Sequence, residues 1–560
     1  MTSAMPAQRS TQIGSEEYQH GGAALRGGPA PRLAAVMLPL AFWLVLAPQY
    51  MFQGNRVSPD SAAYIDCARS IREGRGFQTR LYGGLEPPTW EPIRLWPPGY
   101  PILIAAAMAL GLSPHSAALA VSVLCSGLFV IVVLGYYAKQ LPFAFAALLG
   151  IVFVSMRALL NTGTMCWSEG PYLLLTLVSL ICLMKGTSGM RATASWILVA
   201  GLTGGLSWCV RNVAVALFAS SMCYPVVQLP RLRFKGTALA ICAWLGGWAL
   251  GSGWLVLWNI STFGAPNPYS MPPSELSFFW NSKATFWVMG RDLTALGRFS
   301  DILVNKYVLF ASGIAILLIA SRRLTLRSVV RFLQDHRDRL LLLLFLGFYT
   351  LTIVVGRSVY RWGENINSRH FVAVYWILLL FFGFACEWFA GHVLAGRQRA
   401  RAVLLVGIGL LAALQMRASV LGFLGPADET DKEVRSLAVA LGREIPEGQL
   451  VLSDAIAPLR VFGNVNARRP PRPRRNETPL TWSDIRQAGE DGRLWGFVIV
   501  HGDGYEEGEY GDVLKDISAN ASKFPELRER KRGMAVRVLE YVRDDAGRPE
   551  STIRDANAQP

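Results

Sequence analysis

The sequence has 560 residues, of which 52% are hydrophobic and only 17% are charged, and its mean hydropathy is +0.31. These values exclude an intrinsically disordered chain, a collagen and a small disulfide-stapled secreted module. The formal net charge is +16, but residues 424–560 hold 21 basic and 24 acidic side chains, so the positive excess lies in residues 1–423. A basic membrane region is typical of positive-inside loops, and no basic stripe with interleaved aromatic residues indicates a nucleic-acid partner.

Apolar stretches of membrane-spanning length recur from Pro31 to Leu424. They predict a polytopic α-helical membrane protein with about eleven spans, at 33–52, 116–137, 142–158, 171–185, 194–209, 213–229, 237–258, 303–320, 338–356, 371–391 and 402–421. The short loops rich in Lys and Arg fall on one side, which predicts a multi-pass protein of the cell (inner) membrane with a cytoplasmic N-terminus. Two long loops, 53–115 and 259–302, and the chain after residue 422 then lie on the outer side.

The predicted domains are a disordered cytoplasmic N-terminus (1–30), a membrane domain (31–424), an extracytoplasmic α/β domain (425–545) and a disordered tail (546–560). The pattern of the third domain predicts a polar helix at 430–443, strands at 448–454, 495–501 and 535–542, and helical stretches near 482–488 and 511–520.

The first outer loop predicts a helix that begins at Ser58-Pro59 and ends before Gly74. One face of this helix carries residues spaced by three or four positions: Asp60, Tyr64, Cys67 and Ile71. Asp60 lies in the first turn, where a carboxylate can complement the helix dipole. It can also serve as a general base at the membrane surface, and the residues alone leave both interpretations open.

The end of the same loop, residues 95–114, contains Trp96 and Tyr100 around three prolines and then a short apolar run. The prolines break any preceding helix, and the run is too short to span, so it predicts a half-inserted or interfacial helix. Further on, Ser168 and Glu169 precede an apolar helix. They can cap that helix, or Glu169 can be a functional acid at the membrane boundary.

Three arginines stand at the ends of predicted spans: Arg211, Arg361 and Arg369. Each can snorkel to the interface or bind a phosphate with its planar fork of donors. Ten of the 15 acidic residues in 1–423 fall in outer loops, among them Asp66 and Asp292, which favours chemistry at the outer face.

The sequence contains no CxxC, zinc-site spacing, HExxH or Walker P-loop, so we expect no metal and no cofactor. A disulfide between Cys67 and Cys166 is open but not favoured. The segment 501–511 has Gly-rich spacing, but its glutamates would repel a phosphate, so an acidic surface turn is the prediction. The Arg- and Pro-rich segment 467–477 fits a solvated extended loop, or a contact with anionic headgroups.

Taken together, these segments resemble the GT-C membrane glycosyltransferases, in particular bacterial protein O-mannosyltransferases and lipid A aminoarabinose transferases. The resemblance covers about residues 33–424 and rests on five motifs in order: Asp60 in SPDSAAYIDCA, the stretch WPPGYPILIAA, Ser168-Glu169 in SEGPYLLL, Arg211 after GLTGGLSWCV, and Arg369 in SRHFVAVYWILLL. The sequence departs from the family in two places. Ser61 follows Asp60 where many members have an acidic pair, and His370 follows Arg369 where many have tyrosine.

The resemblance implies an inverting hexosyl- or pentosyltransferase that moves a sugar from a polyprenyl-phosphate donor to an acceptor hydroxyl at the outer membrane face. It implies that Asp60 is the general base and that Glu169 assists in the catalytic site. Arg369, with Arg211 or Arg361, would bind the donor phosphate. The residues implied to line the substrate groove are Tyr64, Trp96, Tyr100, Ser168 and His370. The implied partners are the lipid-linked donor, membrane lipid, and a glycan, lipid or protein acceptor.

Two other classes remain as alternatives. A secondary transporter or a flippase of envelope precursors would also need many spans, but the halves of the sequence show no internal repeat. A non-catalytic assembly protein would use its outer domain for binding and would not depend on Asp60.

Overall fold

The structure is a computed structural model, and contacts between residues divide the chain into two units. The first unit comprises residues 1–56, 67–77 and 92–426, and the second comprises residues 57–66, 78–91 and 427–560. The residues that the structure describes are 28–52, 56–80, 90–189, 193–269, 271, 273–294, 337–360, 366–392, 398–424, 429–446, 449–453, 455–468, 482–491, 493–500, 517, 521, 527–532 and 536–542.

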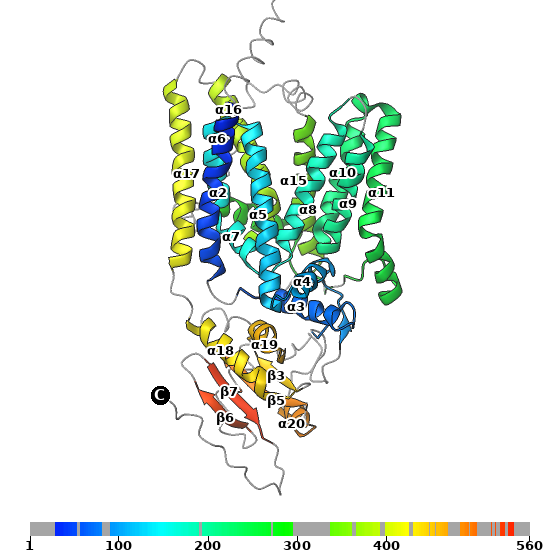
Figure 1. Cartoon of the computed structure of the whole chain (residues 1–560), viewed down its shortest axis with the longest axis vertical. Helices are drawn as coiled ribbons and strands as arrows, with labels where there is room; N and C mark the ends of the chain where they lie inside the picture. Colours follow the sequence, from blue (N-terminus) through cyan, green and yellow to red (C-terminus); the bar gives the residue numbers. More distant parts are fainter. Residues whose placement is uncertain are drawn as a thin grey trace, which may run out of the picture. The chain divides into compact units, whose positions relative to one another are not determined.

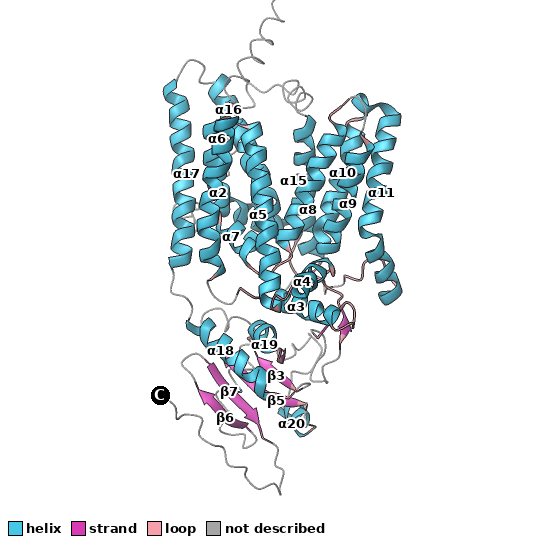
Figure 2. Ribbon diagram, viewed as in Figure 1, coloured by secondary structure: helices cyan, strands magenta, loops and turns pink. Residues whose placement is uncertain are grey.

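The first unit is built from helices, and its long helices run side by side (Figures 1 and 2). Its helices are α2 (Pro29–Met51), α4 (Gly99–Ala109), α5 (Pro114–Gln140), α6 (Phe143–Val154), α7 (Arg157–Thr164), α8 (Glu169–Thr187), α9 (Ala194–Val210), η1 (Asn212–Ala214), α10 (Val215–Val227), α11 (Leu229–Phe263), α12 (Phe278–Thr294), α15 (Arg337–Val359), η3 (Ser368–Phe371), α16 (Val372–His392) and α17 (Gln398–Leu424).

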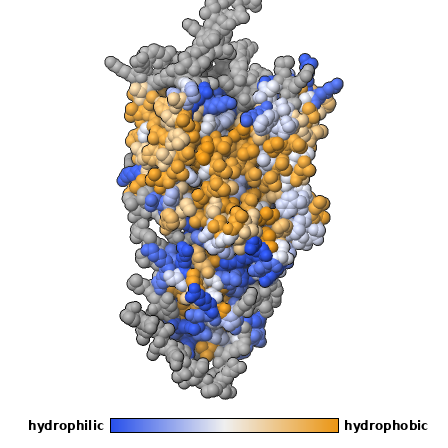
Figure 3. Space-filling model, viewed as in Figure 1, coloured by the Kyte–Doolittle hydropathy of each residue, from blue (hydrophilic) through white to orange (hydrophobic). Residues whose placement is uncertain are grey.

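Seven of the described helices are long and apolar enough to cross a membrane, or eight if the pair α6–α7, bent by 56°, is counted as one span. The count of eleven therefore stays a prediction. The helices α9 and α10 are shorter, with 17 and 13 residues, and the predicted span at 303–320 lies outside the described residues. On the face drawn in Figure 3, hydrophobic side chains cover most of the helical unit, as a lipid-facing surface requires.

The helices α9 and α11 pack with their backbones in contact. Gly201 and Gly205 on α9 lie against the backbone of Trp244 and Trp248 on α11, and a Cβ at either glycine would collide with a carbonyl oxygen. This is the small-xxx-small packing that brings helices together in a membrane. It explains the Gly-rich sequence of α9, and it fixes the helix that ends immediately before Arg211.

Short helices in the two long loops match the sequence in part. The helix α3 (Pro59–Arg72) begins and ends where predicted, and Gly74 follows it with a φ of +77°, a conformation that favours glycine. The apolar run after the prolines forms α4, with 11 residues. The helix α12 in the second long loop was not predicted.

The second unit contains a five-stranded sheet in the order β4-β3-β5-β7-β6, parallel from β4 to β5 and antiparallel beyond it. Its strands are β3 (Leu450–Ser453), β4 (Asn466–Arg468), β5 (Leu494–Val500), β6 (Leu527–Arg532) and β7 (Val536–Tyr541), and its helices are α18 (Glu429–Glu444), α19 (Ile456–Gly463) and α20 (Trp482–Glu490). Buried residues of α18 and α19 cover one face of the sheet, and those of α20 cover the other.

The three strands predicted from the sequence are confirmed as β3, β5 and β7, whereas α19 and the short or charged strands β4 and β6 were not foreseen. The predicted helix at 511–520, both predicted disordered ends, the segment 501–511 and most of 467–477 lie outside the described residues. Two pieces of the first outer loop, 57–66 and 78–91, contact the C-terminal residues and belong to this second unit.

Candidate functional site

The turn before α8 brings Ser168 and Glu169 to Arg211. The side chain of Ser168 does not cap the helix; its Oγ accepts a hydrogen bond from Arg211 Nη1 at 3.2 Å. The same nitrogen lies 2.5 Å from Oε1 of Glu169, whose side chain is 6% exposed. The capping interpretation of Ser168 is therefore wrong, and the buried carboxylate holds a guanidinium group that is still 23% exposed.

The short helix η3 carries Arg369 and His370. It begins with a capping box in which the Asn367 side chain accepts the backbone N–H of Arg369 and the Asn367 N–H donates to Nδ1 of His370 at 3.1 Å. The same Nδ1 lies 3.2 Å from the carbonyl of Asn367, and the imidazole is buried. The guanidinium group of Arg369 lies over the ring of Trp167 with 4.6 Å to the centroid, one residue before Ser168.

A third arginine joins this group. Arg357, in the last turn of α15, is buried, and it acts electrostatically on His370, as do Arg369 and Arg211. We call Arg211, Arg357 and Arg369 the arginine cluster. Guanidinium groups suit a phosphate, since each offers a planar fork of charged donors.

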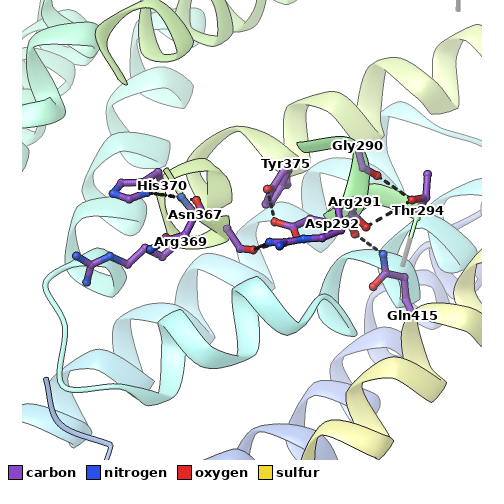
Figure 4. A network of polar contacts seen from close by, with 10 residues as sticks. Gly290, Arg291, Asp292, Thr294, Asn367, Arg369, His370, Tyr375 and Gln415 are labelled. Atoms are coloured by element: carbon purple, nitrogen blue, oxygen red, sulfur yellow. Dashed lines mark hydrogen bonds and ion pairs between the residues drawn. The ribbon is translucent and has the colours of Figure 1, made fainter. Parts of the chain in front are cut away.

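A second network holds η3 on its other side (Figure 4). The carboxylate of Asp292, on α12, accepts hydrogen bonds from Ser368 Oγ at 2.9 Å and from the Tyr375 hydroxyl at 2.6 Å. Arg291 donates to Asp292 Oδ1, the oxygen that also accepts from Ser368, at 3.2 Å. It donates to Ser368 Oγ as well, at 2.7 Å. Gln415, on α17, donates to the backbone carbonyl of Asp292 at 2.5 Å. Asp292 thus joins α12, η3, α16 and α17 immediately beside Arg369.

Asp60 and Tyr64 belong to the second unit. Ser58 and Ser61 cap the start of α3 reciprocally, each side chain accepting the backbone N–H of the other at 3.3 and 3.0 Å. The half-buried Asp60 lies in the first turn of this helix, and both interpretations of its carboxylate, as a partner of the helix dipole and as a base, stay predictions. Tyr64 is buried.

The remaining groove candidates are Tyr100 and Trp96. Tyr100 is fully buried, and its hydroxyl contacts the carbonyl of Ala118 and Oγ of Ser122, both at 2.8 Å. Ser122 in turn donates to the carbonyl of Trp167 at 2.9 Å, so Tyr100 supports the turn on which Arg369 stacks. Trp96 lines a small hollow together with Arg94, Trp208, Asn212, Trp258 and Asn259.

Arg361 lies outside the described residues. The structure shows Cys67 and Cys166 as free thiols, as it does the other six cysteines. Within the described residues, no three His, Cys, Asp or Glu side chains are grouped so that they could hold a metal ion.

Sequence reasoning missed Arg357 and the role of Asp292. Arg357 sits at the end of an apolar span, like the arginines that were selected, so the same criterion could have found it. Asp292 was counted among the outer acids, but nothing in its neighbourhood in the sequence indicates that Ser368 and Tyr375 donate to it.

Comparisons with known proteins place the fold. No family model matches the sequence, and no curated protein matches it. The structure is similar to crystal structures of ArnT from Cupriavidus metallidurans, in the apo state (TM-score 0.53, 13% identity, 90% of this chain and 97% of ArnT covered) and bound to undecaprenyl phosphate (TM-score 0.54, 14% identity, 92% and 99% covered).

It is also similar to the Archaeoglobus fulgidus oligosaccharyltransferase in complex with Zn and sulfate, with a TM-score of 0.52, 11% identity, and 84% of this chain and 68% of that chain covered. ArnT and the oligosaccharyltransferase share the GT-C fold. At these identities the likeness establishes the fold, which is the one that the sequence motifs predicted. The chain is therefore a multi-pass α-helical membrane protein with the GT-C fold and a small C-terminal sheet.

Proposed function

We propose that this protein is an inverting glycosyltransferase that transfers a sugar from a polyprenyl-phosphate donor to an acceptor hydroxyl at the outer face of the cytoplasmic membrane. The observation that carries the proposal is the arginine cluster, in which Arg211 pairs with Glu169 and all three arginines act electrostatically on His370. An anionic lipid headgroup is the ligand that such a site favours. ArnT, of the same fold, has been crystallised with undecaprenyl phosphate.

In the proposed reaction, Asp60 accepts the proton of the acceptor hydroxyl. The acceptor oxygen attacks the anomeric carbon as the bond from that carbon to the phosphate oxygen breaks, and the phosphate leaves with the electron pair. A single displacement inverts the anomeric centre and needs one base, since no covalent intermediate forms. The role of Asp60 rests on the sequence resemblance.

The arginine cluster would bind the donor phosphate and stabilise the negative charge that grows on it. The guanidinium group of Arg369 lies over the ring of Trp167, and we propose that it takes part in binding the phosphate. Glu169 acts by holding Arg211, and we propose it as a positioning residue. Transfer would proceed without a metal ion, with the cluster supplying the positive charge.

The test has two arms. In cells, mass spectrometry of envelope glycolipids and glycoproteins compares wild type, a deletion and Asp60→Asn. One sugar-bearing species should disappear in both mutant strains. In vitro, undecaprenyl phosphate is titrated against the full chain in nanodiscs, and binding should weaken in Arg369→Met but not in Arg417→Met, which changes an exposed arginine on α17.

If the deletion strain kept every sugar-bearing species, the proposal would be contradicted. A transporter or flippase would then be favoured if undecaprenyl phosphate still bound. A species lost on deletion but present in Asp60→Asn would remove Asp60 as the base.

A further inference from the structure

The second unit contains a buried ion triad that joins distant parts of the chain. The carboxylate of Asp66, on α3, is fully buried and pairs through Oδ2 with Nη2 of Arg460 on α19. Its Oδ1 accepts a hydrogen bond from Arg80 Nη2 at 2.9 Å. Arg460 is 1% exposed and the Arg80 side chain 9%. We call Asp66, Arg80 and Arg460 the Asp66 triad.

The second arginine of the triad also binds the end of α19. Asn464 is the C-cap of that helix, in the left-handed conformation, and Arg80 donates to its Oδ1 at 2.7 Å and to its carbonyl at 3.4 Å. A cation at a helix C-terminus is stabilised by the helix dipole. The guanidinium group of Arg80 also lies 5.2 Å from the ring centroid of Trp90. Asp66 carries one negative charge for two arginines, and the C-terminal end of α19 stabilises the second positive charge, that of Arg80.

The Asp66 triad fixes how α3 is rotated. The buried side chains of Tyr64 and Ile65 on the same helix favour the same orientation through packing, and the triad adds a charged constraint to it. A rotation by one residue would leave the Asp66 carboxylate buried without its partners, which is strongly unfavourable.

Asp60 lies six residues before Asp66 on the same helix. At 1.5 Å and 100° a residue, the two carboxylates are separated by about 9 Å along the axis and about 120° around it. The Asp66 triad therefore contacts one face of α3, and Asp60 projects from a different face of the same helix. Fixing the rotation of α3 fixes the direction of Asp60.

We propose that the C-terminal α/β unit positions the candidate base, and that the Asp66 triad is the connection through which it does so. The assignment of Asp60 as base rests on the proposed function, whereas the mechanical link does not. The members of the Asp66 triad are positioning residues, and none of them would touch the substrate.

The experiment combines hydrogen exchange with product analysis on the full chain in nanodiscs and in cells. In Arg460→Met, amide exchange over α3 should accelerate at least about 10-fold, because the variant removes the more buried of the two ion pairs that hold Asp66. The sugar-bearing species should fall by a similar factor, while undecaprenyl phosphate binding stays at the wild-type level. Arg460→Lys, which keeps the charge, should be intermediate.

The matched control is Arg537→Met. Arg537 pairs with Glu529 between β6 and β7 in the same unit, so its loss perturbs the sheet without touching the Asp66 triad. Exchange over α3 should stay unchanged. If Arg460→Met does not accumulate in the membrane, Arg80→Gln removes the less buried partner and should raise α3 exchange in the same way.

Unchanged α3 exchange in Arg460→Met or in Arg80→Gln overturns the link. If amide exchange over α3 is faster in Arg460→Met but the sugar-bearing product stays at the wild-type level, the triad does not position the base. If Asp60→Asn keeps full product while α3 exchange still responds to Arg460→Met, the proposed base is wrong and the mechanical link survives, so the two failures are distinguishable.

Discussion

Two groups of arginines in this molecule differ in burial and in the groups that they contact. In the Asp66 triad, Asp66 accepts from two guanidinium groups and the C-cap of α19 accepts from one of them, and all three side chains are at least nine-tenths buried. In the arginine cluster, Glu169 pairs with Arg211, whose side chain is 23% exposed, and the guanidinium group of Arg369 lies over the ring of Trp167.

The difference separates a structural use of arginine from a binding use. A balanced, buried group specifies one arrangement of the chain, and its removal costs stability. In our proposal the arginine cluster, whose Arg211 is partly exposed, binds an anionic headgroup, so mutation there should change binding more than stability. The two groups should therefore respond oppositely to mutation.

The largest effect is expected from Asp60→Asn, on the helix that the Asp66 triad holds. The product should fall by about 100-fold or more, the scale of a lost general base, because the amide cannot accept the proton. Quantitative mass spectrometry of the sugar-bearing species measures this. Exchange over α3 should match wild type. If the loss of product were accompanied by faster exchange, Asp60 would belong with the triad as a structural residue.

The next effect contrasts Arg369→Met with Arg460→Met. The first should weaken undecaprenyl phosphate binding by about 10-fold, since a charged hydrogen bond is worth about 1.5 kcal/mol or more, and leave the thermal midpoint near that of Arg417→Met. The second should lower the free energy of unfolding by about 3–5 kcal/mol and leave binding unchanged. Nanodisc titrations and thermal melts measure both. If Arg369→Met lowered the thermal midpoint and Arg460→Met did not, the two groups could not be divided into a binding group and a structural group in this way.

A smaller effect is expected at Asp292, which supports η3 from behind. Asp292→Asn keeps the shape but weakens the acceptor for Ser368 and Tyr375, so undecaprenyl phosphate binding should fall by about 3–10-fold, at the lower end of the value of a charged hydrogen bond. Tyr375→Phe removes one donor and should cost less. Equal binding in wild type and Asp292→Asn would show that η3 is held without this network.

Ionic strength should affect the arginine cluster and the Asp66 triad differently, with a smaller effect than the mutations. Raising ionic strength from about 0.1 to about 0.5 M should weaken undecaprenyl phosphate binding two- to three-fold, because exposed charges are screened beyond a Debye length that falls below about 10 Å. Exchange over α3 should not change, since the Asp66 triad is shielded from solvent. A salt-sensitive α3 would mean that the triad opens readily.

No effect is expected from removing metal ions. Product formation in membranes should be equal with EDTA and with added Mg²⁺ or Mn²⁺, because in our proposal the arginine cluster supplies the positive charge. Activity that is lost in EDTA and restored by one ion would instead require a metal in the reaction.

The sequence predicted the local features well because they depend on neighbouring residues. Ser58-Pro59 started α3, the prolines before α4 stopped the chain from spanning, and the apolar stretches became helices. It also placed Ser168, Glu169 and Arg211 in candidate roles, and the structure brings these three together.

Contacts between side chains far apart in the sequence could not be predicted from the sequence. Asp66 meets Arg460 at a separation of 394 positions, and Asp292 meets Ser368 at 76. No local spacing encodes either contact, because the partners are chosen by how the units fold. Tyr100 was assigned to a groove, yet its hydroxyl is used inside the protein, because an aromatic residue after a proline turn can face either way.

The glycine contacts between α9 and α11 have a practical consequence for anyone purifying this protein. Helices held by direct backbone contact depend on shape, and the surrounding solvent contributes little to their association. Extraction from the bilayer into a mild detergent should therefore preserve the place where α9 ends, and with it the pairing of Arg211 and Glu169. Ligand titrations after solubilisation would then report on the same headgroup site as titrations in the native membrane.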